Sequence, residues 1–169
     1  MTREANERIV AAQERASVAE QRAAEANLEL AKIKAPRILT PAAQQHVSEQ
    51  MRAFAGTPFT MGVFNDPEPI DLMNQIDNAL VAAGWQETEW KSGGDIVIGR
   101  SPRPNFGYTL VIGLYVQADN KHASDFGPIV QALAAILTAE GVPAKPEVGR
   151  MAPETNNDAI KILVGKKPL

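Results

Sequence analysis

The sequence predicts an α+β protein: a long N-terminal helix, coiled-coil-like, followed by a small α/β sandwich. Residues 1–35 contain no Gly and no Pro and are rich in Ala, Glu, Arg and Gln, which are good helix formers. Residues 36–169 alternate amphipathic helical patterns with short apolar runs and Gly/Pro punctuation. We therefore expect two parts, a helical stalk over 1–35 and a globular domain over 36–169.

The apolar residues of the stalk recur at alternating steps of four and three from Ala5 to Ile33. This is the heptad pattern of a coiled coil, sustained over about four heptads. Because the pattern is mostly alanine, an isolated helix of this kind is marginal in water. We expect it to self-associate or to dock on a partner helix; a solvated single helix is the alternative. The predicted oligomer seam is Ile9, Ala12, Ala16, Ala19, Ala23, Ala26, Leu30 and Ile33.

The globular domain should begin with a helix after Pro36, which ends the stalk because proline lacks a backbone donor. Thr40 is a good N-cap, Pro41 occupies the first helical position, and Gly56 is placed to close the helix. Val47, Met51 and Phe54 form its packing face.

Two more amphipathic helices are expected, over about 66–84 and 124–141, each ended by a glycine. The first should turn Ile70, Met73, Ile76 and Leu80 to one face, and the second Ile129, Leu133, Ile136 and Leu137. Strands are expected at 59–64, 85–90, 95–100, 108–117, 144–149 and 159–164, with a hairpin-like turn at 91–94.

This order predicts five or six strands with two or three helices. A ferredoxin-like βαβ core is one arrangement that fits it. A doubly wound, flavodoxin-like sheet is disfavoured, because too few helices exist to cover both faces. Trp85 and Trp90 have odd spacing on one predicted strand, so they should point to opposite faces.

Composition excludes several classes of function. The formal net charge of -3 argues against a nucleic-acid binder. The absence of cysteine removes disulfides, thiolate metal sites and cysteine nucleophiles. No run of about 18 apolar residues could span a bilayer, and the first residues lack the apolar stretch of a secretory signal. We expect a cytoplasmic chain without a membrane span of its own and without a cofactor.

The C-terminal Gly165-Lys166-Lys167 invites comparison with a phosphate-binding loop, but the comparison fails. Such a loop needs GxxxxGK[ST] between a strand and a helix, whereas Ile160 stands at the first glycine position and Lys167 at the Ser/Thr position. No GxGxxG follows any predicted strand either. We interpret the motif as the charged end of a strand.

Metal and catalytic constellations are also missing. His46 and His122 lie on different elements, without a carboxylate at metal-ligand spacing. The acids near residues 66–71 are explained by a helix N-terminus, where carboxylates favour the dipole. Ser101 has no neighbouring base, so no catalytic residue is predicted. If a small anion binds, Arg100, Arg103 and Arg150 are the expected contacts, because arginines clasp carboxylates and phosphates in a bidentate manner.

The segments "KAPRILTPAAQQHVSEQMRAFAGTPF", "AAGW" and "NNDAIKILVGKKP" resemble the C-terminal part of uncharacterised proteobacterial membrane-anchored proteins. Those proteins carry transmembrane helices, then a charged coiled-coil segment, then a small α/β domain. The resemblance implies a tethered, oligomerising domain and transfers no site residue. Because Met1 leads straight into the heptads, we expect either a soluble version or the cytoplasmic portion of a longer parent.

The leading functional hypothesis is a non-enzymatic scaffold, in which the stalk forms a homo-oligomer and the globular domain binds a protein partner. The alternative is a small-ligand sensing module for an anion or nucleotide. An enzyme is the least favoured hypothesis, because it would need a pocket that gathers distant acids and hydroxyls.

Overall fold

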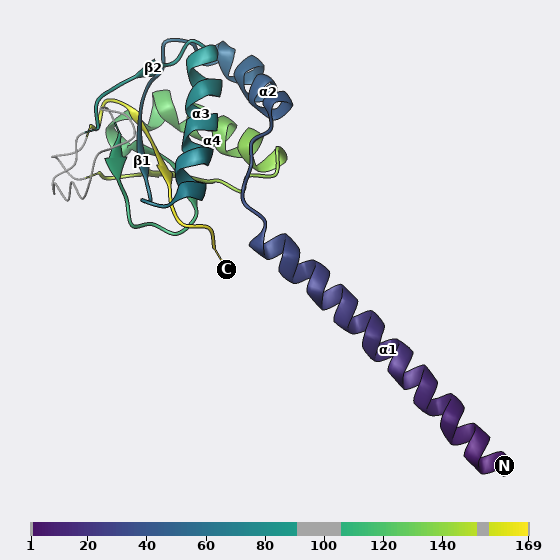
Figure 1. The fold of residues 1–169 in the computed structure, drawn as a ribbon. Helices are drawn as coiled ribbons and strands as arrows, with labels where there is room; N and C mark the ends of the chain where they lie inside the picture. The colour runs from purple at the N-terminus through teal and green to yellow at the C-terminus, as the bar shows by residue number, and fades with distance from the viewer. Residues whose placement is uncertain (1, 91–105, 152–155, 169) are drawn as a thin grey trace. The chain divides into compact units, whose positions relative to one another are not determined.

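The structure is a computed structural model that describes residues 2–90, 106–151 and 156–168. The chain divides into two units, one formed by the residues up to Ala35 and one over Pro36–Pro168. The first unit is the single helix α1 (Arg3–Lys34), drawn in purple in Figure 1. None of its residues is buried. The large seam residues Ile9, Leu30 and Ile33 are 46%, 48% and 46% exposed. The predicted long N-terminal helix is therefore confirmed.

The second unit contains α2 (Pro41–Met51), α3 (Pro67–Ala82) and α4 (Ala123–Ala139), with short 3-10 turns at Arg52–Phe54 and Asn120–His122. The Thr40 hydroxyl caps α2 by accepting a hydrogen bond from the Ala43 amide at 3.2 Å. Gly84 follows α3 with φ +84, a conformation that glycine adopts without strain. The start of α2 and the end of α3 are thus as predicted, whereas α2 ends at Met51 and continues as the 3-10 turn Arg52–Phe54 rather than running on to Gly56.

Six strands within the described residues form one sheet: β1 (Pro58–Val63), β2 (Gln86–Glu87), β3 (Gly107–Tyr108), β4 (Leu114–Asp119), β5 (Lys145–Gly149) and β6 (Ile160–Val164). The strand order is β2-β1-β6-β4-β5, and β3 also pairs with β1, further along that strand. The strand β6 is central; it runs parallel to β1 and antiparallel to β4. The α+β prediction, with its numbers of strands and helices, is confirmed.

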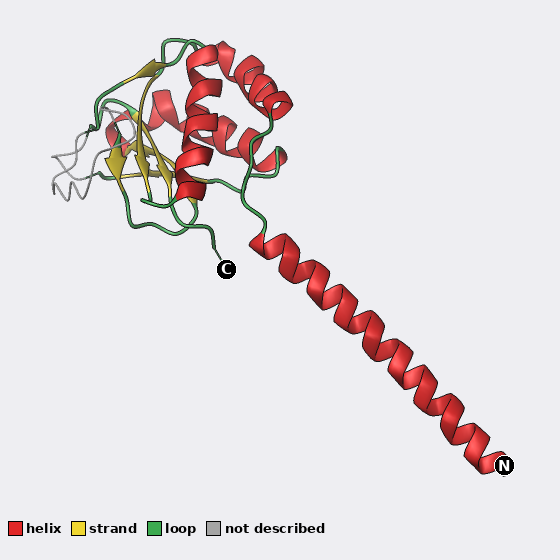
Figure 2. Cartoon of the chain, viewed as in Figure 1, coloured by secondary structure: helices red, strands yellow, loops and turns green. Residues whose placement is uncertain are grey.

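Two βαβ units flank β6. One is β1–α3–β2 and the other is β4–α4–β5, and the two strands of each unit are parallel neighbours. Such crossovers are right-handed. Because the two units start on antiparallel strands and run away from β6 in opposite directions, right-handed crossovers place α3 and α4 on the same face. Figure 2 shows the helices of this unit together on one side of the sheet.

The sheet corrects the ferredoxin-like expectation. A ferredoxin-like core splits its βαβ units by placing another strand between the two parallel ones. Here the strands of each unit are hydrogen-bonded to each other, and β6 separates the units instead. The expected strand at 95–100, and the turn before it, lie outside the described residues.

The single strand expected over 108–117 is also wrong. The chain leaves β3 at the β1 edge and enters β4 on the far side of β6, so it must cross the end of β6. Gly113, with φ +98, turns the chain there. The crossing is tight, because a side chain at Gly165 would collide with the Val111 carbonyl. Gly165 therefore serves this close approach rather than a phosphate.

The core lies between the sheet and the helices. Alternate residues of β1, such as Phe59 and Met61, join α3 residues in one fully buried cluster. Trp85 belongs to this core and donates from Nε1 to the Met51 carbonyl at 3.1 Å. The intervening residues of each strand face the other way, toward the side without helices, and it is there that polar groups gather.

Candidate functional site

A polar row crosses the helix-free face of the sheet. Thr60 of β1 pairs in register with Lys161 of β6, Lys161 pairs with Gln117 of β4, and Gln117 pairs with Glu147 of β5. Residues in register on neighbouring strands have side chains on the same face. We call Thr60, Lys161, Gln117 and Glu147 the polar row.

Lys161 is the buried centre of this row. It is only 7% exposed, although lysine is almost never buried without a partner. Its ammonium lies 5.0 Å from the centre of the Trp90 ring, a cation–π contact. No carboxylate of the described residues forms an ion pair with it. Burial therefore lowers the pKa of Lys161 below its ordinary value, with no acid opposing the shift.

Two other members of the polar row differ in how their hydrogen bonds are met. The Thr60 hydroxyl is buried, and within the described residues it has no hydrogen-bond partner. The Gln117 amide, by contrast, donates to the exposed Glu147 carboxylate at 2.6 Å. The inner end of the row thus has unmet polar groups, and its outer end is satisfied.

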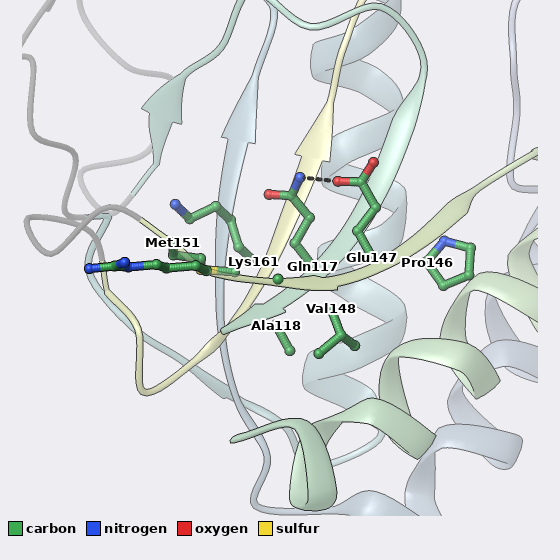
Figure 3. Close-up of a pocket in the computed structure, with 9 residues that line it drawn as sticks. Gln117, Ala118, Pro146, Glu147, Val148, Met151 and Lys161 are labelled. Atoms are coloured by element: carbon green, nitrogen blue, oxygen red, sulfur yellow. Dashed lines mark hydrogen bonds between the residues drawn. The ribbon is translucent and has the colours of Figure 1, made fainter. Parts of the chain in front are cut away.

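An open hollow of about 700 Å³ lies beside three members of the row, Lys161, Gln117 and Glu147. Its side-chain lining includes Lys161, Gln117, Glu147, Arg150 and Met151. Figure 3 shows Lys161, Gln117 and Glu147 on one side of the sheet and Ala118 and Val148 on the other, toward α4. The volume falls in the range of small-molecule sites.

Glycines allow Trp90 to lie against this face. A Cβ at Gly62 would come within 2.8 Å of the Trp90 ring, and a Cβ at Gly107 would collide with it. Trp85 is buried in the core on the helix side, so the two tryptophans lie on opposite faces as expected. The expected strand over 85–90 is wrong in length, because β2 spans only Gln86–Glu87. Trp90 covers Lys161.

Asp119 fixes the rim of the hollow at the end of β4. Its carboxylate accepts hydrogen bonds from the Lys121 amide and the Met151 amide, both at 2.9 Å. These two bonds lower the pKa of Asp119. Since Met151 follows Arg150 directly, Asp119 anchors the turn that presents Arg150.

The structure brings only some of the predicted residues together. Arg150 is exposed and lines the same hollow as Lys161, whereas Arg100 and Arg103 lie outside the described residues. His46 contacts Glu140 at 2.5 Å, and His122 contacts Asp158 at 3.0 Å. No group of three metal-ligating side chains occurs among the described residues. The seam residues all lie on α1.

Glu68, near the start of α3, has a second role that the sequence did not indicate. Arg37 Nε and Nη2 donate to its two carboxylate oxygens, each at 2.8 Å. Burial alone would raise the pKa of Glu68, but the hydrogen bonds and charge of Arg37 outweigh it and lower the pKa. Arg37 Nη2 also donates to the Gly165 carbonyl at 2.7 Å, so the pair ties three segments together.

Sequence reasoning missed Lys161, although a signal existed. The run Ala159–Val164 is apolar at every position except 161, and a wholly apolar strand is typical of the buried centre of a sheet. A lysine inside such a run has to be buried. The residues across from it could not be read from the sequence, because they depend on the pairing of β1, β6 and β4.

Comparisons with models of known protein families, with curated proteins and with solved structures found no match. Among the described residues, no helix has the length and apolar character needed to cross a membrane.

Proposed function

We propose that this protein is a non-enzymatic scaffold, in which α1 joins copies of the chain and the unit over Pro36–Pro168 presents a surface to a partner. The exposed seam of α1 carries this proposal. Ile9, Leu30 and Ile33 are each about half exposed on a helix without buried residues. A single amphipathic helix gains most of its stability from burying such a stripe.

The charges beside the seam favour a parallel, in-register pair. Residues that flank a coiled-coil seam face those of the next heptad on the second helix and set its orientation. In a parallel pair Arg15 faces Glu20 of a second copy, and Glu29 faces Lys34, while the remaining flanking arginines face Gln13 and Asn27. Glu29 also contacts Lys32 within α1, so the pair of Arg15 and Glu20 is the stronger argument.

The antiparallel arrangement is less favourable. With the seams fully overlapped, Arg22 meets Arg22 of the second copy, and Glu20 meets Glu20. Each like-charge contact at an exposed site is unfavourable by about 0.5 kcal/mol. The same overlap brings Arg15 onto Glu29, so attractive and repulsive contacts balance in the antiparallel pair. In the parallel pair the flanking contacts are attractive or neutral.

Assembly is tested by comparing two double variants of the full chain in sedimentation equilibrium. Ala16→Glu with Ala23→Glu puts charges into the seam and should yield single chains, because buried unpaired carboxylates oppose association. Ala24→Glu with Ala31→Glu makes the same change on an outer face and should keep the mass of the unmodified protein. A single-chain mass for the unmodified protein at every concentration would remove the proposal.

Orientation is tested with introduced cysteines, since the chain has none of its own. Ile33→Cys should form a disulfide-linked pair under mild oxidation only if the helices are parallel and in register. Leu28→Cys, on the outer face of α1, is the control for random encounters. Linkage between an Ile9→Cys chain and an Ile33→Cys chain would instead indicate the antiparallel pair.

The resemblance to membrane-anchored proteins extends the proposal to location: a cytoplasmic domain tethered in a longer parent protein. Membrane fractionation of cells that express the natural gene tests this. Recovery of the whole product in the membrane fraction until detergent is added is the expected result, and recovery in the soluble fraction would contradict it.

A second candidate function is the sensing of a small anion or nucleotide, favoured by one observation. Arg150, just after β5, and Lys161, on β6, line the same hollow. A ligand that binds only the folded state raises its stability. Thermal unfolding with a panel of nucleotides and phosphorylated metabolites tests this candidate, and a panel without any shift would exclude it.

A further inference from the structure

We propose that the hollow beside Lys161 binds a small oxyanion, a carboxylate or phosphate group, which the Lys161 ammonium holds directly and Arg150 meets at the rim. This inference rests on the second candidate function, for which it names the site and the ligand class. It does not depend on assembly through α1, so the two proposals can fail separately.

The first argument is that Lys161 has no counter-ion in the described part of the chain. Only 7% of Lys161 is exposed. Its in-register neighbours Thr60 and Gln117 are uncharged. A buried charge without an opposite charge is unfavourable, and an apolar residue would fill the position better. An anion in the hollow would supply the missing charge.

The second argument is independent and concerns Thr60. Its hydroxyl is buried beside Lys161 on the same face and has no hydrogen-bond partner among the described residues. Buried polar groups are nearly always hydrogen-bonded, so an unmet one calls for an explanation. Thr60 is not among the residues that line the hollow, but its unmet hydroxyl stands beside the Lys161 ammonium, which has no counter-ion among the described residues. A polar ligand therefore fits this end of the row better than an apolar one.

The charges around the hollow define the ligand further. Lys161 and Arg150 are cations, while Glu147, toward the β5 edge, is an acid already held by the Gln117 amide. An anionic group is therefore attracted toward Lys161 and repelled from Glu147. The arrangement fits a small ligand with its negative charge at one end and uncharged or hydrogen-donating atoms at the other.

Trp90 provides a reporter for binding. Its ring centre lies 5.0 Å from the Lys161 ammonium, so an anion that reaches the ammonium changes the environment of the indole. The other tryptophan, Trp85, is buried in the core and hydrogen-bonded to Met51. A change in emission on anion binding should therefore come from Trp90 and be lost in Trp90→Phe.

The experiment titrates the full chain with inorganic phosphate and, separately, with acetate, against sodium chloride at equal ionic strength. Tryptophan emission and the midpoint of thermal unfolding are read together. A saturable emission change with phosphate or acetate, accompanied by a raised midpoint, is the expected result. The two arms distinguish a phosphate site from a carboxylate site. Chloride alone should give neither effect.

Variants connect the binding to the proposed residues. Lys161→Met should weaken the affinity about tenfold or more, because it removes a charge-assisted hydrogen bond. Arg150→Gln, an exposed change that leaves folding intact, should weaken it about threefold. Lys145→Met, the same lysine change on β5 but outside the lining of the hollow, is the matched control and should leave the affinity unchanged.

Two outcomes would overturn the inference. One is the absence of any saturable change with both anions in the unmodified chain. The other is binding by Lys161→Met and Arg150→Gln with unaltered affinity, which would leave anion sensing standing but place it elsewhere.

Discussion

Arg37 and Lys161 are both buried cations of the same unit, 8% and 7% exposed. Lys161 belongs to the central strand β6, and Arg37 contacts the residue just after it. Their surroundings differ. Arg37 meets the Glu68 carboxylate with two hydrogen bonds of 2.8 Å and reaches the carbonyl of Gly165 just after β6. Lys161 meets an indole ring and an open hollow, and no carboxylate of the described residues pairs with it.

The difference separates a cation that serves the fold from one that is available for a ligand. A buried charge stabilises a fold only when its counter-ion is buried with it in good geometry. Arg37 fulfils this condition, although its Nη1 has no hydrogen-bond partner within the described residues. Lys161 does not fulfil it, and a side chain that weakens a fold is commonly retained for function.

The largest expected effect comes from removing the counter-ion of Arg37. Glu68→Gln leaves the guanidinium buried without an opposite charge, so the free energy of unfolding should fall by about 2–4 kcal/mol. Urea unfolding measures it. Asp71→Asn, an exposed acid on the same helix, is the control and should change the value by less than about 0.5 kcal/mol. Equal effects of the two substitutions would show that Arg37 does not depend on Glu68.

A change of pH should alter the free energy of unfolding by a smaller amount, through Glu68 at acidic pH and through Lys161 at alkaline pH. The pKa of Glu68 is lowered in the folded chain, so the stability it contributes is present at neutral pH and is lost as the pH falls through that lowered value. The pKa of Lys161 is also lowered, below 10.5. The unfolded chain then binds this proton more tightly, so the free energy of unfolding should rise between the lowered pKa and about 10.5.

Urea unfolding of the unmodified chain and of Lys161→Met between pH 8 and pH 11 isolates the contribution of Lys161 to the free energy of unfolding. Glu147 and Arg150, the charged residues that line the hollow with Lys161, are present in both proteins and cancel in the difference. The unmodified chain should gain stability relative to the variant as the pH rises. A constant difference would mean that Lys161 titrates as an exposed lysine does.

The helices were predictable because their signals are local. Thr40 and Pro41 start α2, and a glycine follows α3, so these boundaries depend only on neighbouring residues. The strand order could not be read in this way, because it depends on pairings between distant residues. The crossing over 109–113 shows the consequence: an apolar run that looks like one strand belongs to two strands, β3 and β4, on opposite sides of β6.

The candidate site was less predictable than the fold. Arg150 was expected from its residue type, and it does line the hollow. Lys161 was not expected, because it acquires its neighbours Thr60 and Gln117 only when three strands come into register. A lysine at the centre of the run Ala159–Val164 was the one local clue to it.

The most direct test compares the free energies of unfolding of Arg37→Met and Lys161→Met with that of the unmodified chain, without added phosphate or carboxylate. Arg37→Met should be destabilised by about 3 kcal/mol, because Glu68 loses its partner. Lys161→Met should be as stable as the unmodified chain or more stable, since an apolar side chain replaces an uncompensated charge. A loss in Lys161→Met as large as that in Arg37→Met would contradict the account, because Lys161 would then be a structural cation like Arg37.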